Sequence, residues 1–163
     1  MKRVTPSAKK EQEPEKKTPQ KININIYLTK YLAAQDKIEI SPVKRDIDYT
    51  DSPLKAAIEK LLLGPSDTED AKGLSSSIPG GVRLLSVTIK NRTACLDFNS
   101  QIETGVGISL LESRLYQIVY TATQFENVKQ VQFLIEGKIR AKFGSENINI
   151  RKPYSRLSTK PVF

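Results

Sequence analysis

The sequence predicts an α+β domain in which two helices cover one face of a mixed or antiparallel sheet, forming a two-layer sandwich. Three observations lead to this fold class. Several short segments alternate apolar and polar residues with the period of two that is typical of half-buried strands. Two longer segments repeat apolar residues with the helical period. The elements are expected in the order β-β-α-β-β-α-β between residues 22 and 137, and two amphipathic helices need one sheet face to cover them.

The first predicted elements are two strands and a helix. Residues 22–29 alternate cleanly, and residues 38–47 form a second extended segment in which Pro42 suits a sheet edge or a bulge. The helix begins after Ser52, with Pro53 at its first position, and Gly64 is placed for a left-handed C-terminal cap. The residues expected in the core are Ile22, Ile24, Ile26, Leu28, Leu54, Ala57, Ile58, Leu61 and Leu62.

The next connection, residues 64–81, is predicted to be a solvated loop. Its acids, Asp67, Glu69 and Asp70, lack the spacing of a calcium loop. Its last two glycines open a strand, whereas a phosphate loop would open a helix. We therefore expect neither a metal ion nor a nucleotide here.

A hairpin, a second helix and a last strand complete the predicted domain. The hairpin joins residues 82–90 to residues 93–99 through Asn91-Arg92. Ser109 and Glu112 have the spacing of a capping box, before a helix that should run to about Gln124. The residues predicted to face the core are Leu85, Val87, Ile89, Ala94, Leu96, Phe98, Leu111, Leu115, Ile118, Val119, Ala122, Phe125, Val131, Phe133 and Ile135.

Charge and composition divide the chain into three parts. Residues 1–21 carry +4 (7 basic minus 3 acidic) with three prolines, and are predicted to be a disordered basic linker. Residues 22–150 form the domain, and residues 151–163 a flexible basic tail. Ile139, Phe143 and Ile148 could supply one short edge strand before that tail. No apolar run is long enough to span a membrane and no export signal is visible, so the sequence predicts a soluble chain.

Most common enzyme chemistry is excluded by the residue types present. The chain has no histidine and one cysteine, Cys95, which removes His-based nucleophile pairs, His-ligated zinc and Cys-pair metal sites. Asp97 and Glu103 could form a carboxylate pair of the kind used in glycoside hydrolysis, but a solvent-facing strand residue and a loop acid are the simpler interpretation. Tyr116 and Tyr120, four residues apart, are expected at the rim of the core. No enzyme activity, cofactor or small-molecule substrate is predicted.

Four segments of the chain combine turn residues and apolar patterns in a recognisable order: IYLTKYL, SPLKAAIEKLLLGPSDTE, SSSIPGGVRLLSVTIKNRTACLDFNS and LLESRLYQIVYTATQFENVKQVQFLIEGK. Together they resemble the GerMN domain family of bacterial sporulation and cell-envelope proteins. The resemblance covers residues 24–138 and implies a non-catalytic module similar to ring-building-motif domains. It also implies the extracytoplasmic face of a bacterial membrane, and a protein partner in the envelope or self-association.

The candidate interaction surface is the basic C-terminal region. Residues 138–163 carry +6 (7 basic minus one acidic), whereas residues 22–137 carry −2 (12 minus 14). Basic side chains with interleaved aromatics suit an anionic lipid, a cell-wall polymer or a nucleic acid, so binding through the basic termini is the alternative function. Nucleic acid is the less expected partner, and a carboxylate-based hydrolase is a third hypothesis. The surface residues are Lys138, Arg140, Lys142, Arg151, Lys152, Tyr154 and Arg156, interleaved with Phe143.

Overall fold

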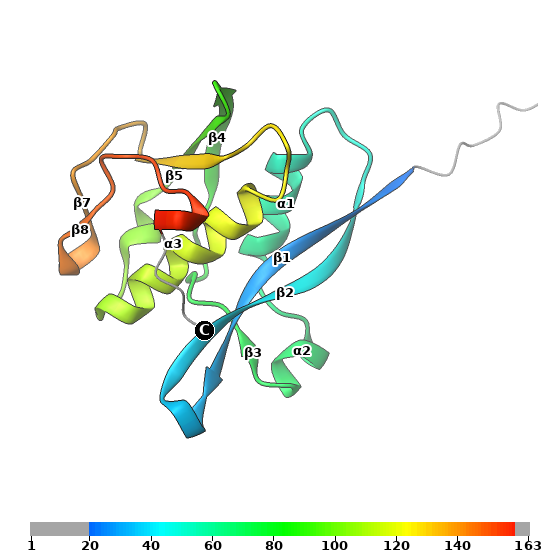
Figure 1. Cartoon of the computed structure of the whole chain (residues 1–163), viewed down its shortest axis with the longest axis vertical. Coiled ribbons are helices and arrows are strands. Elements are labelled where there is room, and N and C mark those ends of the chain that lie inside the picture. The colour runs from blue at the N-terminus through cyan, green and yellow to red at the C-terminus, as the bar shows by residue number, and fades with distance from the viewer. Residues whose placement is uncertain (1–19, 159–163) are drawn as a thin grey trace, which may run out of the picture.

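The computed structural model describes residues 20–158, so most of the predicted linker and the last five residues lie outside the described region. The predicted α+β class and the order of its main elements are confirmed (Figure 1). The elements are β1 (Lys21–Leu32), β2 (Lys37–Asp48), α1 (Pro53–Leu62), α2 (Asp67–Ala71), β3 (Leu74–Ser75), β4 (Leu84–Lys90), β5 (Thr93–Phe98), α3 (Ile108–Ala122), β6 (Gln130–Ile135), β7 (Lys142–Phe143) and β8 (Ile148–Asn149).

The described strands do not form one continuous sheet. They divide into β2-β1-β3, β4-β5-β6 and the ribbon β7-β8. In the second sheet β4 and β5 are antiparallel whereas β5 and β6 are parallel, so of the two predicted sheet types, mixed or antiparallel, this sheet is mixed. Helices α1 and α3 cover one face of it, and the long β1-β2 hairpin covers the helices from the other side (Figure 1). The β1-β2 hairpin, the two helices, the mixed sheet and the β7-β8 ribbon contribute to one hydrophobic core.

The two strands predicted for residues 22–29 and 38–47 pair as the antiparallel β1-β2 hairpin, and its register explains the proline. Tyr27 lies opposite Pro42. The Tyr27 N–H and C=O are directed away from β2, toward Thr121 and Gln117 of α3. Pro42 therefore occupies a pair that makes no hydrogen bonds between the strands, where its missing N–H removes nothing from the ladder.

The predicted core face of β4 is wrong for Leu85 and Ile89. These side chains are 44% and 40% exposed, although the facing strand β5 buries Ala94 and Leu96 completely. The register of β4 shifts between Leu84 and Ser86, which takes Leu85 out of the alternation. Ile89 lies opposite Ala94, yet β4 is an edge strand and its end beside the turn is not covered.

Helix α1 matches its prediction, including Pro53 at its start and a left-handed Gly64 (φ +75°) after its end. The predicted capping box at Ser109 is wrong. Ser109 is the second residue of α3, and its carbonyl accepts a hydrogen bond from the Ser113 hydroxyl. The described capping box lies instead at Ser66, whose hydroxyl accepts from the Glu69 N–H while the Glu69 carboxylate accepts from the Ser66 N–H.

That box begins α2, so the predicted solvated loop contains a short helix. Glu69 also accepts two hydrogen bonds from Arg45 of β2, at 2.7 and 2.5 Å. The expectation that the acids of this loop stay in water is therefore wrong for Glu69, whose side chain is 14% exposed. The connector is fastened to the hairpin by this ion pair and by the β1-β3 pairing.

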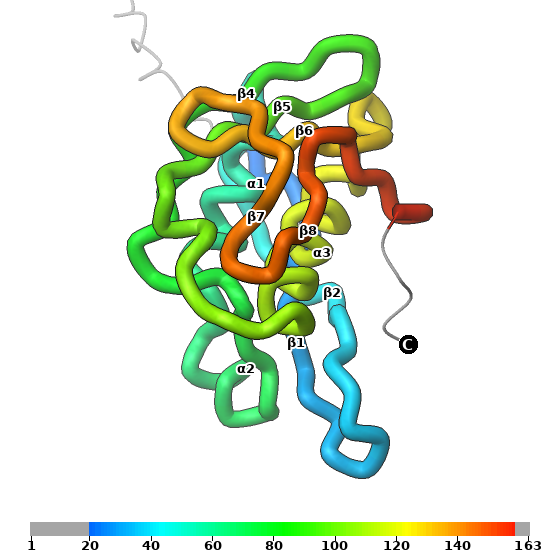
Figure 2. The backbone as a smooth tube through the Cα atoms, turned by 90° about the vertical axis from the view of Figure 1, so that its left-hand side faces the viewer, coloured from blue at the N-terminus to red at the C-terminus, as the bar shows by residue number. Residues whose placement is uncertain are grey.

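The C-terminal segment returns to the domain. Phe143, in the β7-β8 ribbon beside α3 (Figure 2), is 1% exposed. Tyr154 exchanges two backbone hydrogen bonds of 2.8 Å with Val131 of β6. Among residues 20–158 no helix is long and apolar enough to cross a membrane.

Candidate interaction surfaces

The predicted basic surface is only partly one surface. Lys138, Lys142, Arg151 and Lys152 are exposed on the segment that forms and flanks the β7-β8 ribbon. Arg140 is exposed there too and is ion-paired with Glu103. The aromatic residues between them face the protein: Phe143 is in the core, and the Tyr154 ring lies edge-on against Phe133 at 5.9 Å. The ribbon thus presents cations without the aromatic platform that base stacking requires.

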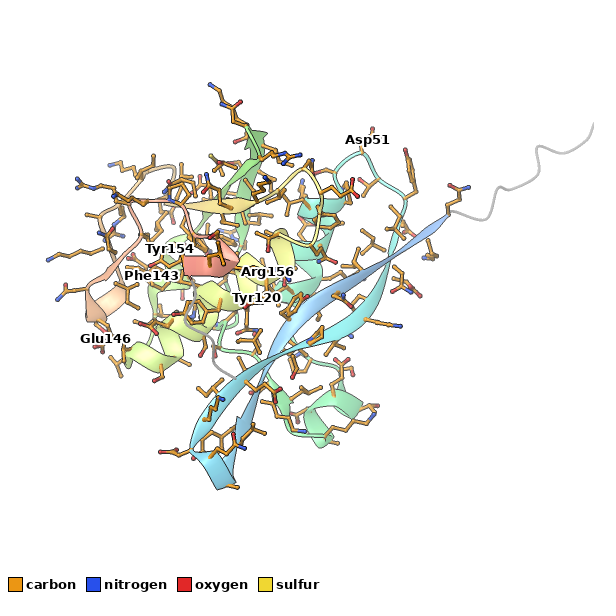
Figure 3. All side chains as sticks on the ribbon, in the orientation of Figure 1. Asp51, Tyr120, Phe143, Glu146, Tyr154 and Arg156 are labelled. Carbon is orange, nitrogen blue, oxygen red and sulfur yellow. The ribbon has the colours of Figure 1, made fainter. Side chains whose placement is uncertain are left out.

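Arg156 belongs to a different cluster. Its guanidinium lies over the rings of Tyr120 and Tyr27, 4.6 and 5.6 Å from their centroids, and the two rings are themselves 5.4 Å apart (Figure 3). Its Nε also donates to the Thr123 hydroxyl and its Nη2 to the Tyr120 carbonyl. Arg156 therefore fastens the C-terminal segment to α3 and β1, and Tyr120 takes part in that contact.

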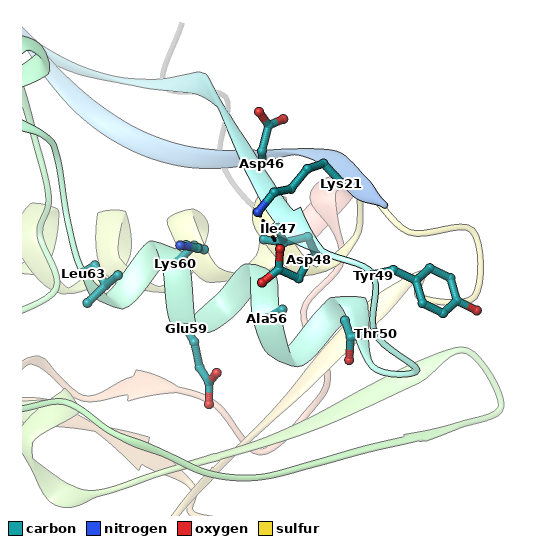
Figure 4. Close-up of a pocket in the computed structure, with 10 residues that line it drawn as sticks. All are labelled: Lys21, Asp46, Ile47, Asp48, Tyr49, Thr50, Ala56, Glu59, Lys60 and Leu63. Atoms are coloured by element: carbon teal, nitrogen blue, oxygen red, sulfur yellow. Dashed lines mark hydrogen bonds and ion pairs between the residues drawn. The ribbon is translucent and has the colours of Figure 1, made fainter. Parts of the chain in front are cut away.

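A groove of about 450 Å³ lies between the end of β2 and helix α1 (Figure 4). Tyr49 and Leu63, at its two ends, are 65% and 78% exposed. Lys21 and Asp48 form an ion pair of 2.5 Å across the hairpin, and the hydrogen bond between them raises the pKa of Lys21 and lowers that of Asp48. The groove is lined by Lys21, Asp46, Ile47, Asp48, Tyr49, Thr50, Ala56, Glu59, Lys60 and Leu63.

A second exposed apolar feature precedes and begins α3. Val106, Ile108 and Leu110 are 76%, 52% and 36% exposed, within five residues of chain. A groove of about 410 Å³ lies near them, between the tip of the β1-β2 hairpin and α3. Their exposure within five residues of chain makes this segment a candidate contact region.

Buried polar side chains on α3 were not predicted from the sequence. Gln117 and Thr121 are buried on α3, and the half-buried Gln124 lies two residues after its end. The three side chains bind backbone groups of Asn25 and Tyr27. They take the place of a neighbouring strand along the inner edge of β1. Their spacing of four and three residues was a readable signal of one helix face, but the backbone edge that they meet is known only from the fold.

Arg114 is the other buried polar residue that the sequence did not reveal. It is 2% exposed and donates to the carbonyls of Ser77, Ile102 and Thr104. Burial lowers the pKa of its guanidinium. These three hydrogen bonds hold the loop after β5 and the segment that precedes β4 against α3, so the role of Arg114 is structural.

Three of the acids considered for catalysis or metal binding, Asp97, Glu103 and Glu69, make structural contacts. Asp97 accepts a hydrogen bond of 2.9 Å from the Gly137 N–H, and Glu103 accepts one of 3.2 Å from the Gly144 N–H. The hydrogen bonds from Arg45 lower the pKa of Glu69 to about 2. In the described part of the chain no group of three or more His, Cys, Asp or Glu side chains could hold a metal ion.

The fold and these surfaces define a small α+β domain in which several acidic and basic side chains hold loops and the C-terminal segment in place. The chain belongs to the Germane family, described as sporulation and spore germination, whose family model matches residues 26–140. This confirms the family resemblance seen in the sequence. A search of curated proteins found no match.

Three of the solved structures that are similar to this chain illustrate its fold. The tandem GerMN domains of the sporulation protein GerM from Bacillus subtilis are 28% identical, with a TM-score of 0.69 over 85% of this chain. The chain spans 47% of that structure. A candidate lipoprotein from Clostridium perfringens is 20% identical (TM-score 0.60, 84% of this chain and 89% of its own length). The first GerMN domain of GerM is 18% identical (TM-score 0.67, 83% and 98%).

Proposed function

We propose that this chain is a non-catalytic interaction module of a bacterial cell-envelope or sporulation-associated protein. It acts by docking another protein of the envelope or by self-association, on the extracytoplasmic face of the membrane. The observation that carries the proposal is that the two candidate catalytic acids make structural hydrogen bonds. Asp97 and Glu103 are each bound to a backbone N–H, so they act as ties for the turns at Gly137 and Gly144.

Family membership and exposed apolar surface support docking. The chain belongs to a sporulation and germination family, and its 28% identical neighbour is a sporulation protein. Val106 and Ile108 expose apolar area that contact with another protein would remove from water.

Mass-resolved light scattering and capture from an envelope extract test this proposal. We expect the intact chain to form an oligomer or to retain a defined envelope protein. The double variant Val106→Ser/Ile108→Ser tests whether that surface takes part, and Leu157→Ser is the matched control because its side chain is also exposed (98%). A monomer that retains no envelope protein would contradict the proposed function.

The exposed cations of the β7-β8 region favour one alternative, the binding of an anionic polymer. Lys138, Lys142, Arg151 and Lys152 are exposed together, and the aromatic residues between them are turned inward. Such a surface binds phosphate charges in preference to bases. Polyphosphate binding should weaken steeply with salt and weaken further in Lys142→Ser/Lys152→Ser. No binding of the intact chain at low salt would exclude this alternative.

A further inference from the structure

The β1-β2 hairpin has one edge that the described residues leave uncovered. The inner edge of β1 is occupied by β3 and by the polar side chains of Thr121, on α3, and Gln124, just after it. Strand β2 is the outermost strand of its sheet, and no described strand pairs with its other side. Unpaired backbone N–H and C=O groups on such an edge can pair with an added strand.

The hydrogen-bond pattern identifies which groups of β2 face outward. Asn25 and Tyr27 direct their backbone groups to α3, so their partners, Lys44 and Pro42, are not bonded to β1. The Tyr49 N–H donates to the Gln20 carbonyl at 2.8 Å, as expected if residues that bond across the hairpin alternate with residues that face outward. Hence Pro42, Lys44, Asp46 and Asp48 all direct their backbone groups outward, and all four are exposed.

Pro42 limits the usable edge to a short window. It has no N–H, so an added strand would lose a bond there. Between residues 44 and 48 the outward groups include the N–H and C=O of both Asp46 and Asp48, whereas the Lys44 carbonyl already accepts from Arg45. The window suits a strand of about five residues, whose central residue would exchange two hydrogen bonds with Asp46.

The same window forms one wall of the groove beside α1 (Figure 4). A residue opposite Ile47 would place its side chain on the face of Ile47, toward Ala56 and the exposed Leu63. A residue opposite Asp46 would share the outer face with a carboxylate that has no ion-pair partner within 4.0 Å among residues 20–158. The groove therefore favours an apolar residue in the first position and a basic residue in the second.

A second copy of this chain fits the window less well. Two β2 edges paired antiparallel across residues 44–48 would centre on Asp46 and place two carboxylates directly opposite each other, which is destabilising. The flanking Lys44–Asp48 pairs would compete with the ion pair that Asp48 already makes with Lys21. Charge complementarity thus points to a different chain.

We propose that the edge of β2 from Lys44 to Asp48, with the adjoining face of α1, binds an extended peptide strand of a partner protein by strand addition. The strand carries a basic residue opposite Asp46 and an apolar residue opposite Ile47. This site rests on the proposed function, because it names the surface and the binding mode through which the module docks its partner.

A defined peptide tests the site. The probe is acetyl-Lys-Val-Lys-Val-Lys-amide, added to the ¹⁵N-labelled intact chain while amide shifts are followed. We expect saturable shifts at residues 44–48 and along α1. Two matched peptides serve as controls: one has an N-methylated central lysine, which removes the N–H that would bind Asp46, and the other has glutamates for lysines. Each control peptide should bind at least about tenfold more weakly than the probe.

Two variants at one position separate backbone pairing from charge. Asp46→Pro removes an outward N–H at a position equivalent to that of Pro42, so the ladder with β1 is kept. Asp46→Asn removes the charge and keeps the N–H. We expect Asp46→Pro to bind the probe about tenfold more weakly than Asp46→Asn does, with thermal midpoints of the two variants within a few degrees.

Any of four results would contradict the proposed site. The wild type shows no saturable shifts, or its shifts centre on other residues. The N-methylated peptide binds as tightly as the probe, or Asp46→Pro and Asp46→Asn bind the probe with equal affinity. An oligomer that Asp46→Pro dissociates would assign the edge to a second copy and overturn the partner assignment. If the intact chain retains an envelope protein and Asp46→Pro retains it equally, the site fails while the proposed function stands.

Discussion

Replacing Gln117 with leucine should destabilise the domain more than any exposed substitution, because this side chain joins three parts of the chain. Gln117 is fully buried. Its Oε1 accepts from the Ser77 N–H at 2.9 Å, and its Nε2 donates to the Tyr27 carbonyl at 2.9 Å and to the Ser76 hydroxyl at 3.1 Å. Leucine has a similar size but offers none of these hydrogen bonds.

The magnitude follows from the groups left behind. The Ser77 N–H and the Tyr27 carbonyl would lose their partners inside the protein, and each buried orphan costs about 1–3 kcal/mol. Burying leucine in place of an amide offsets roughly 1 kcal/mol of that loss. The free energy of unfolding should therefore fall by about 1–5 kcal/mol.

Urea unfolding followed by circular dichroism measures this loss, and hydrogen exchange of the Ser77 amide locates it. Gln101→Leu is the matched control, because Gln101 is exposed and should change stability by no more than about 0.5 kcal/mol. A loss below about 1 kcal/mol for Gln117→Leu, or unchanged protection of the Ser77 amide, would refute the assignment of Gln117 as the tie between β1, α3 and residues 76–77.

The other predictions concern contacts that do not involve Gln117. Glu69 has a pKa lowered from 4.5 to about 2, so the stability that its carboxylate contributes is present above pH 4.5 and is lost as the pH falls toward 2. Glu69→Gln should lower the free energy of unfolding by about 1–2 kcal/mol at pH 7, and should make that free energy depend less on pH between 4.5 and 2. Phe143→Ala should cost about 3–5 kcal/mol in urea unfolding, and a cost under 1 would place the ring outside the core. Gly144→Ala should lower the thermal midpoint more than Gly64→Ala, since both have positive φ but only at Gly144 would a Cβ meet Leu111 Cδ1 at 2.8 Å; equal shifts would contradict this contact.

The local pattern of residues was sufficient where one face of an element decides its structure. The alternation of β1, the stripe of α1 with Pro53 and Gly64, and the apolar residues of β6 all predicted what the structure shows. The pattern was insufficient at Leu85 and Ile89, because strand alternation reports which side chains share a face and not whether another element covers that face.

The candidate surface shows the same division. The cations of residues 138–152 were predicted from the sequence and are exposed. The roles of Phe143, Tyr154 and Arg156 depend on how the C-terminal segment returns to Val131 and to Tyr120, contacts between residues that are distant in the chain.

The sequence by itself determined the α+β class, the order of the main elements and the family, because short-range periodicity and turn residues are encoded locally. Only the tertiary structure decided that α3 lies between the hairpin and the mixed sheet, that Gln117, Thr121 and Gln124 complete the inner edge of β1, and that the outer edge of β2 is left open beside α1. The physical reason is that a backbone edge carries no sequence mark of its own: whether it is paired, capped or exposed depends on which distant element is packed against it.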